Sequence, residues 1–255
     1  MITETTPSVY YDPAIQDMTE ELTRLILRRD ELRFHVSADL RTEYMLKVGS
    51  KELAVWRKSV EYGKEKRRLS LIRSEINRGV EPDLELVEEQ LEFEFQEYQK
   101  KIEKRVEEMK ELLQRMDGEV MTEEETKEFK DMYYKIVKNI HPDVNPEVTE
   151  VETEFFHKAV DAYKRGDMDK MRAIYWNVIE DKDVVIPEKD LKQKIMEVKA
   201  DIDRIMHEFP FDKIDFLKDK EAVRERCEEL DEMMRDYDEQ LKIIRDVLKA
   251  MGVLQ

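Results

Sequence analysis

The sequence has few of the residues that interrupt helices or cross-link chains. Its 255 residues include 6 glycines, 7 prolines and a single cysteine, Cys227. One cysteine excludes an intramolecular disulfide and a zinc site built from several thiolates. No run of about 18 consecutive apolar residues occurs, so no membrane-spanning helix is predicted. Residues 1–12 form a polar tail without the basic-then-apolar layout of a secretory signal.

Charged residues, in contrast, are abundant and unevenly balanced. The chain has 45 lysines and arginines against 62 acidic residues, which gives a net charge of −17. This excess disfavours nucleic-acid binding by the surface as a whole and leaves room only for a local basic patch. Many charges with few glycines and prolines are typical of long, solvent-exposed helices, and the lone cysteine fits a reducing compartment. We therefore expect an all-α, cytoplasmic protein.

Apolar residues recur every three or four positions along most of the chain, as in amphipathic helices. The pattern predicts helices over about 13–48, 50–78 and 84–116. Gly49-Ser50 is interpreted as a stop followed by a cap, and Gly79 as a second stop. The third helix would be about 50 Å long. We expect the first two helices to fold back along it as an antiparallel, coiled-coil-like arm over residues 13–118.

Two further apolar stripes lie between residues 187 and 255. They are separated at Phe209-Pro210, because proline disfavours a helical conformation in the preceding residue. The stripes predict an antiparallel helical hairpin, with Cys227 as a buried packing residue in its seam. No glycine-rich phosphate loop, nucleophile motif or cluster of metal ligands is found, so we expect no enzyme activity, cofactor or metal.

The segment between the two arms, residues 119–180, has a different character. Thr122-x-x-Glu125 is the pattern of a capping box, which predicts the start of a helix. That helix should end at His141-Pro142-Asp143, because of its proline. Between Lys127 and His141, only two acidic residues accompany four lysines: Lys127, Lys130, Lys135 and Lys138. The segment is therefore locally basic in an acidic chain.

This segment resembles the J-domain of DnaJ-type co-chaperones. Besides the tripeptide, several residues match the family in register: Tyr133-x-Lys135-Ile136, Phe156, Ala162-Tyr163, Arg172-Ala173 and Tyr175. The match covers residues 122–177, about a fifth of the chain. The family usually has a short first helix with a tyrosine-rich Leu-Gly motif, and nothing like it precedes Thr122. No Gly/Phe-rich linker or cysteine-rich module follows.

The resemblance implies a non-catalytic partner of a DnaK-type ATP-dependent chaperone. In the family, the tripeptide and the basic helix face dock on the chaperone and stimulate its ATP hydrolysis. Carried over by position, the partner-binding residues are His141, Pro142, Asp143, Lys130, Lys135 and Lys138. An exposed proline loop can present a carboxylate to an arginine, and a basic face speeds approach to an acidic partner. The helical arms would then select the client or the site of action.

Other interpretations remain open on sequence grounds. Aspartate and proline are ordinary turn residues, and lysines commonly line a solvated helix face. The chain could instead be a coiled-coil adaptor or scaffold that keeps a vestigial J-like unit, since heptad stripes pair helices readily. Nucleic-acid binding through the lysine helix is a weaker alternative, because the net charge opposes it.

Overall fold

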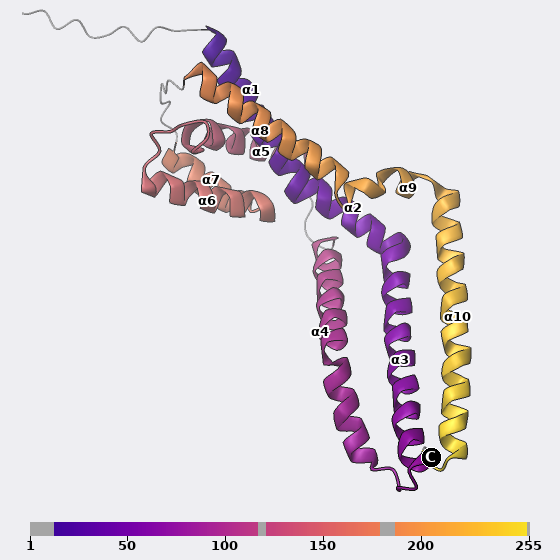
Figure 1. Cartoon of the computed structure of the whole chain (residues 1–255). Coiled ribbons are helices and arrows are strands. Elements are labelled where there is room, and N and C mark those ends of the chain that lie inside the picture. The colour runs from indigo at the N-terminus through magenta and orange to yellow at the C-terminus, as the bar shows by residue number, and fades with distance from the viewer. Residues whose placement is uncertain (1–12, 117–120, 179–186, 254–255) are drawn as a thin grey trace, which may run out of the picture. The chain divides into compact units, whose positions relative to one another are not determined.

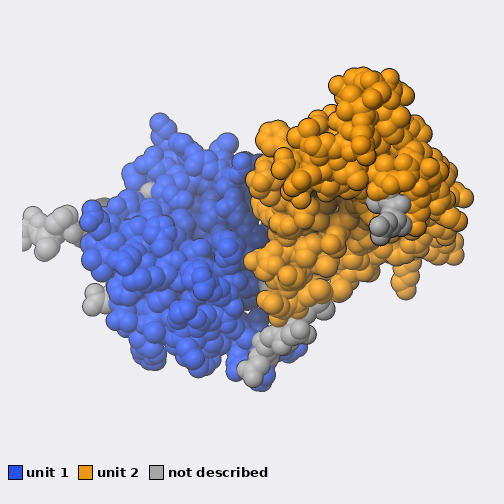
Figure 2. Space-filling view, turned by 90° about the horizontal axis from the view of Figure 1, so that it is seen from below, with its two compact units in different colours: residues 1–39, 119–212 blue, residues 40–118, 213–255 orange. Residues whose placement is uncertain are grey.

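A computed structural model of the chain describes residues 13–116, 121–178 and 187–253. All regular structure in these residues is helical, which confirms the predicted all-α class. No helix in this part of the chain is long and apolar enough to cross a membrane. The chain divides into two compact units (Figure 2), each built from two separated stretches. Unit 1 comprises residues 1–39 and 119–212, and unit 2 comprises residues 40–118 and 213–255.

The N-terminal helices follow one another without a non-helical residue. They are α1 (Pro13–Glu31), the π-helix η1 (Leu32–Val36), α2 (Ser37–Tyr44), the π-helix η2 (Met45–Gly49) and α3 (Ser50–Asn77). The predicted stop at Gly49 is wrong, because Gly49 keeps helical angles of φ −60° and ψ −31°. A Cβ on Gly49 would lie only 2.9 Å from the Met45 sulfur. Glycine therefore serves close packing at this position and forms no turn.

Three long helices of unit 2 lie side by side: α3, α4 (Leu84–Met116) and α10 (Lys220–Ala250) (Figure 1). The short η3 (Phe211–Lys213) and α9 (Ile214–Lys218) precede α10. Lys51 pairs with Asp231 and Lys58 with Asp238, so α3 and α10 run parallel. Two buried clusters hold these helices together; they contain Leu69, Ile72, Val87, Leu91, Ile244 and Leu248, and Val48, Val55 and Leu230.

The predicted apolar stripes exist, but their partners differ from those expected. Helix α8 (Glu188–His207) packs against α1 in unit 1, whereas α10 packs against α3 in unit 2. The helices predicted to form an arm over 13–118, and those predicted to form a hairpin over 187–255, are thus divided between the two units. Cys227 does lie in the α10 seam, where its thiol donates to the Lys47 carbonyl at 3.3 Å, but it is half-buried.

Gly63 offers a test of the packing in unit 2. It lies within α3 with negative φ, and an added Cβ would meet the Phe95 ring at an ordinary contact distance of 3.5 Å. Gly63→Ala should therefore raise the free energy of unfolding by about 0.5–1 kcal/mol, through helix propensity. Urea unfolding followed by α3 amide signals measures this gain. Gly49→Ala, which meets the Met45 sulfur, should gain less; an equal gain would contradict our explanation of Gly49.

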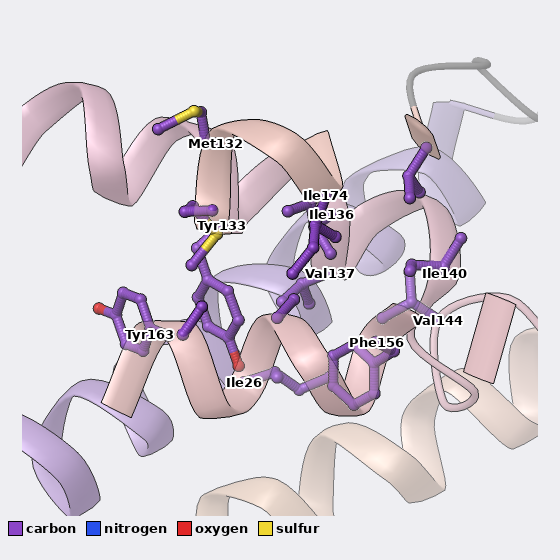
Figure 3. Packing of buried hydrophobic residues seen from close by; sticks show 14 of the residues in the cluster. Ile26, Met132, Tyr133, Ile136, Val137, Ile140, Val144, Phe156, Tyr163 and Ile174 are labelled. Carbon is purple, nitrogen blue, oxygen red and sulfur yellow. The ribbon is translucent and has the colours of Figure 1, made fainter. Parts of the chain in front are cut away.

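Unit 1 places α5 (Glu123–Ile140), α6 (Glu150–Arg165) and α7 (Met168–Val178) around one core (Figure 3). The predicted capping box at Thr122 and Glu125 is present, and a second one joins Thr149 and Glu152. Gly166 ends α6 in the left-handed conformation, at φ 69°. Leu22 and Ile26 of α1 are fully buried in the same core as Tyr133 and Tyr163.

Candidate partner-docking site

The His141-Pro142-Asp143 tripeptide forms a tight loop directly after α5. The His141 amide donates to the Val137 carbonyl at 3.1 Å, which is the last helical bond. The His141 carbonyl then accepts from the amides of Val144, at 2.9 Å, and Asn145, at 2.7 Å. The chain therefore folds back on itself within five residues.

The Asn145 side chain joins the two ends of the loop. Its side chain is almost fully buried; its amide donates to the Asn139 carbonyl at 2.8 Å, and its Oδ1 accepts from the Glu147 amide at 3.0 Å. Asn145 was not among the residues predicted for the site, although asparagine before proline is a turn signal. The loop geometry is thus maintained by hydrogen bonds among residues 137–147.

His141 lies beneath the loop and offers almost no surface. Its side chain belongs to the buried set, and its ring meets the Phe156 ring edge-on, with 4.7 Å between centroids. The Asp143 amide donates to His141 Nδ1 at 2.9 Å, so this nitrogen must be unprotonated. Burial lowers the pKa of His141 to about 4, which agrees with a neutral ring. His141 therefore supports the loop from inside, while Pro142 is exposed.

The buried His141 makes the stability of unit 1 depend on pH. Below pH 6.5 the His141 side chain is protonated in the unfolded chain. In the folded chain it stays neutral until the pH approaches its lowered pKa of about 4. The free energy of unfolding should therefore fall between pH 6.5 and about pH 4, in total by about 3 kcal/mol. Urea unfolding at several pH values, followed by α5 amide signals, measures this loss.

His141→Gln is the control for this prediction, because glutamine does not titrate. The stability difference between wild type and variant should shrink as the pH falls toward 4. A difference that stays constant from neutral pH to about pH 4 would show that His141 is not the titrating group.

Asp143 carries the accessible charge of the loop. Its side chain is 46% exposed, and its Oδ1 lies 3.3 Å from Nζ of Lys194 on α8. Lys194 Nζ also donates to the Asp143 main-chain carbonyl at 3.0 Å. The second carboxylate oxygen is 4.0 Å from His141 Nδ1. Lys194 was not predicted to belong to the site, because it lies 51 residues further along the chain.

The predicted docking lysines lie in three different surroundings on α5. Lys130 forms an ion pair with Glu31, the last residue of α1, with 2.7 Å between Lys130 Nζ and Glu31 Oε1. Lys135 donates to the Tyr175 hydroxyl at 3.0 Å and lies 5.4 Å from the centre of that ring. Lys138 is half-buried and has no ion pair within the described residues. The basic face is therefore partly neutralised by α1.

A groove of about 490 Å³ runs between α5 and α7 beside these lysines. Its lining includes Lys127, Lys135, Tyr175 and Trp176, and Trp176 is 76% exposed. Arg172 and Glu128 close one wall as an ion pair, with an N–O distance of 2.9 Å. This groove could not be predicted from the sequence, because it depends on how α7 packs against α5.

A buried polar contact joins α1 to α5. The Tyr133 hydroxyl donates to Asp30 Oδ2 at 2.7 Å, and Asp30 also pairs with Arg29 at 2.8 Å. Burial, together with the Asp30 charge, raises the pKa of Tyr133. The Tyr133 ring stacks on Tyr163 with 4.0 Å between centroids. These contacts fix the helix that carries the candidate lysines.

Comparison of the chain with protein-family models, with curated proteins and with solved structures finds no match. Among the described residues, no group of three or more histidines, cysteines and acidic residues is placed to hold a metal ion. The site offers a half-exposed carboxylate on a hydrogen-bonded loop at the end of a lysine-bearing helix.

Proposed function

We propose that unit 1 docks on a DnaK-type chaperone through the loop His141–Asp143 and the exposed face of α5, and stimulates its ATP hydrolysis. The observation that carries this proposal is the Asp143 carboxylate, half-exposed beside Pro142 on a loop closed by its own hydrogen bonds. Such a loop loses little conformational entropy on binding. Its carboxylate can form a charge-assisted pair with an arginine of the partner.

The position of α1 supports the proposal. The J-domain family has a short first helix that is missing directly before Thr122. In unit 1, Leu22 and Ile26 of α1 pack on α5, and Asp30 binds Tyr133. A helix from about ninety residues earlier thus covers a core that would otherwise be open.

The lysines contribute mainly to the rate of encounter. Lys130 and Lys135 are engaged by Glu31 and Tyr175, which leaves Lys127 and Lys138 as the less constrained charges of α5. Surface charges that are not held in an ion pair steer association more than they set affinity. The specific contact is therefore assigned to Asp143.

The test is single-turnover ATP hydrolysis by a DnaK-type chaperone from the same organism, with and without the full-length protein. We expect a faster hydrolysis rate that saturates with added protein. An unchanged rate, with the protein folded by circular dichroism and the chaperone active alone, would overturn the proposal.

A second candidate function, as a coiled-coil adaptor or scaffold that assembles with further copies of itself, is favoured by one observation in unit 2. Phe93 of α4 is 83% exposed in an open groove of about 930 Å³ between α3 and α4. Aromatic side chains are enriched at protein–protein contact surfaces relative to the rest of the protein surface. Sedimentation velocity over a range of concentrations, with Phe93→Ser as control, tests this function. The adaptor function predicts assembly that depends on Phe93 and is indifferent to Asp143.

A further inference from the structure

We propose that Lys194 of α8 competes with the chaperone for Asp143, so that α8 acts as an autoinhibitory contact on the docking loop. This inference rests on the proposed function. It concerns how strongly the loop can bind, and it follows from contacts within unit 1.

Lys194 already forms an ion pair with the Asp143 carboxylate that a partner would have to bind. Its Nζ lies 3.3 Å from Asp143 Oδ1 and donates to the Asp143 main-chain carbonyl at 3.0 Å. The Lys194 side chain is 26% exposed, so most of its stem is covered. His141 is neutral and supplies no competing positive charge. An arriving arginine therefore meets a carboxylate that is already paired.

The packing of α8 explains why Lys194 lies over the loop. Leu191 and Ile195, on either side of Lys194 in the helix, are buried in the same core as Ile140 and Val144. Lys199 pairs with Glu21 of α1 at 2.7 Å and ties the middle of α8 to that helix. The ammonium group is thus positioned by apolar anchors that do not depend on Asp143.

The loop does not need Lys194 to keep its shape. The Asp143 amide is held by His141 Nδ1, and the Val144 and Asn145 amides by the His141 carbonyl. Removal of the Lys194 charge should therefore leave the loop folded and the carboxylate unpaired. The main effect of Lys194 on docking is electrostatic, because its positive charge beside Asp143 disfavours the approach of an arginine.

The test compares wild type with Lys194→Met, which keeps the apolar stem and removes the charge. The concentration that gives half-maximal stimulation of ATP hydrolysis should fall about two- to fivefold, the usual worth of a partly exposed ion pair. Lys192→Met is the matched control, because Lys192 is exposed and pairs with Glu188 of its own helix. Lys194→Gln provides a second neutral variant should methionine disturb folding.

The outcomes separate the two proposals. Stronger stimulation by Lys194→Met, with Lys192→Met like wild type, supports the competition. Equal or weaker stimulation by both neutral Lys194 variants overturns it and leaves the co-chaperone function standing. No stimulation by wild type or any variant overturns the co-chaperone function, and the inference with it.

Discussion

Asp143→Asn is expected to raise, by about tenfold or more, the protein concentration that gives half-maximal stimulation of a DnaK-type chaperone. Asparagine has nearly the same shape, but it cannot form a charge-assisted pair with an arginine. Loss of such a pair weakens binding by about tenfold or more. Single-turnover ATP hydrolysis over a titration of the variant measures the effect.

Two comparisons make this result specific to Asp143. Glu147→Gln removes the same charge from an exposed residue after the same loop and should behave like wild type. Asp143→Asn should also keep the circular dichroism and melting temperature of wild type, because the Asp143 side chain is 46% exposed and the loop is closed by other groups. If Asp143→Asn stimulates as wild type does, the loop is not the trigger.

Asp30→Ala should lower the free energy of unfolding of unit 1 by about 3 kcal/mol or more. Asp30 is almost fully buried, accepts the Tyr133 hydroxyl at 2.7 Å and pairs with Arg29 at 2.8 Å. Its removal leaves the buried Tyr133 hydroxyl and the mostly buried Arg29 guanidinium without this partner. The free-energy cost of removing both groups from water is then no longer offset by their bonds to Asp30. Urea unfolding followed by α5 amide signals measures the loss.

Tyr133→Phe and Asp17→Ala bracket this prediction. Tyr133→Phe removes one hydrogen bond and leaves Asp30 paired with Arg29, so about 1–2 kcal/mol should be lost. Asp17→Ala removes an exposed carboxylate from the same helix and should change stability by about 0.5 kcal/mol or less. If Asp30→Ala is no more destabilising than Asp17→Ala, the buried contact is not a main link between α1 and α5.

The local features of the fold could be predicted from the sequence because they depend on neighbouring residues. The capping box at Thr122 and Glu125, the helix end before Pro142 and the helix stop at Gly79 are all present. Each acts within about one helical turn and leaves a recognisable pattern. The all-α class follows from the same short-range periodicity.

The choice of helical partners could not be predicted in the same way. An apolar stripe shows that a helix has a buried face, but it does not show which helix covers that face. Helix α10 therefore pairs in parallel with α3, although the sequence suggested an antiparallel hairpin with α8. Gly49 was misjudged because its role depends on the Met45 side chain that packs against it.

In the candidate site, too, the local features were predictable and the tertiary contacts were not. The place of the tripeptide at the end of a helix was predictable, whereas the burial of His141 under Phe156 and the contact of Asp143 with Lys194 were not. Both features arise from tertiary packing, and Lys194 is 51 residues from Asp143 in the chain. No pattern within one helix marks such a pair.

The interleaving of the two units constrains how the chain can fold during its synthesis. Tyr133 is 103 residues from its partner Asp30, and Asp231 is 180 residues from Lys51. Parts of α1 and α3 therefore leave the ribosome long before the helices that cover them, with Leu22, Ile26 and Val55 still exposed to solvent. Such long-range closure slows folding and favours aggregation of the nascent chain. It also means that a fragment cut at residues 119–180 lacks both α1 and α8, so the loop proposed for docking should be assayed in a chain that includes both helices.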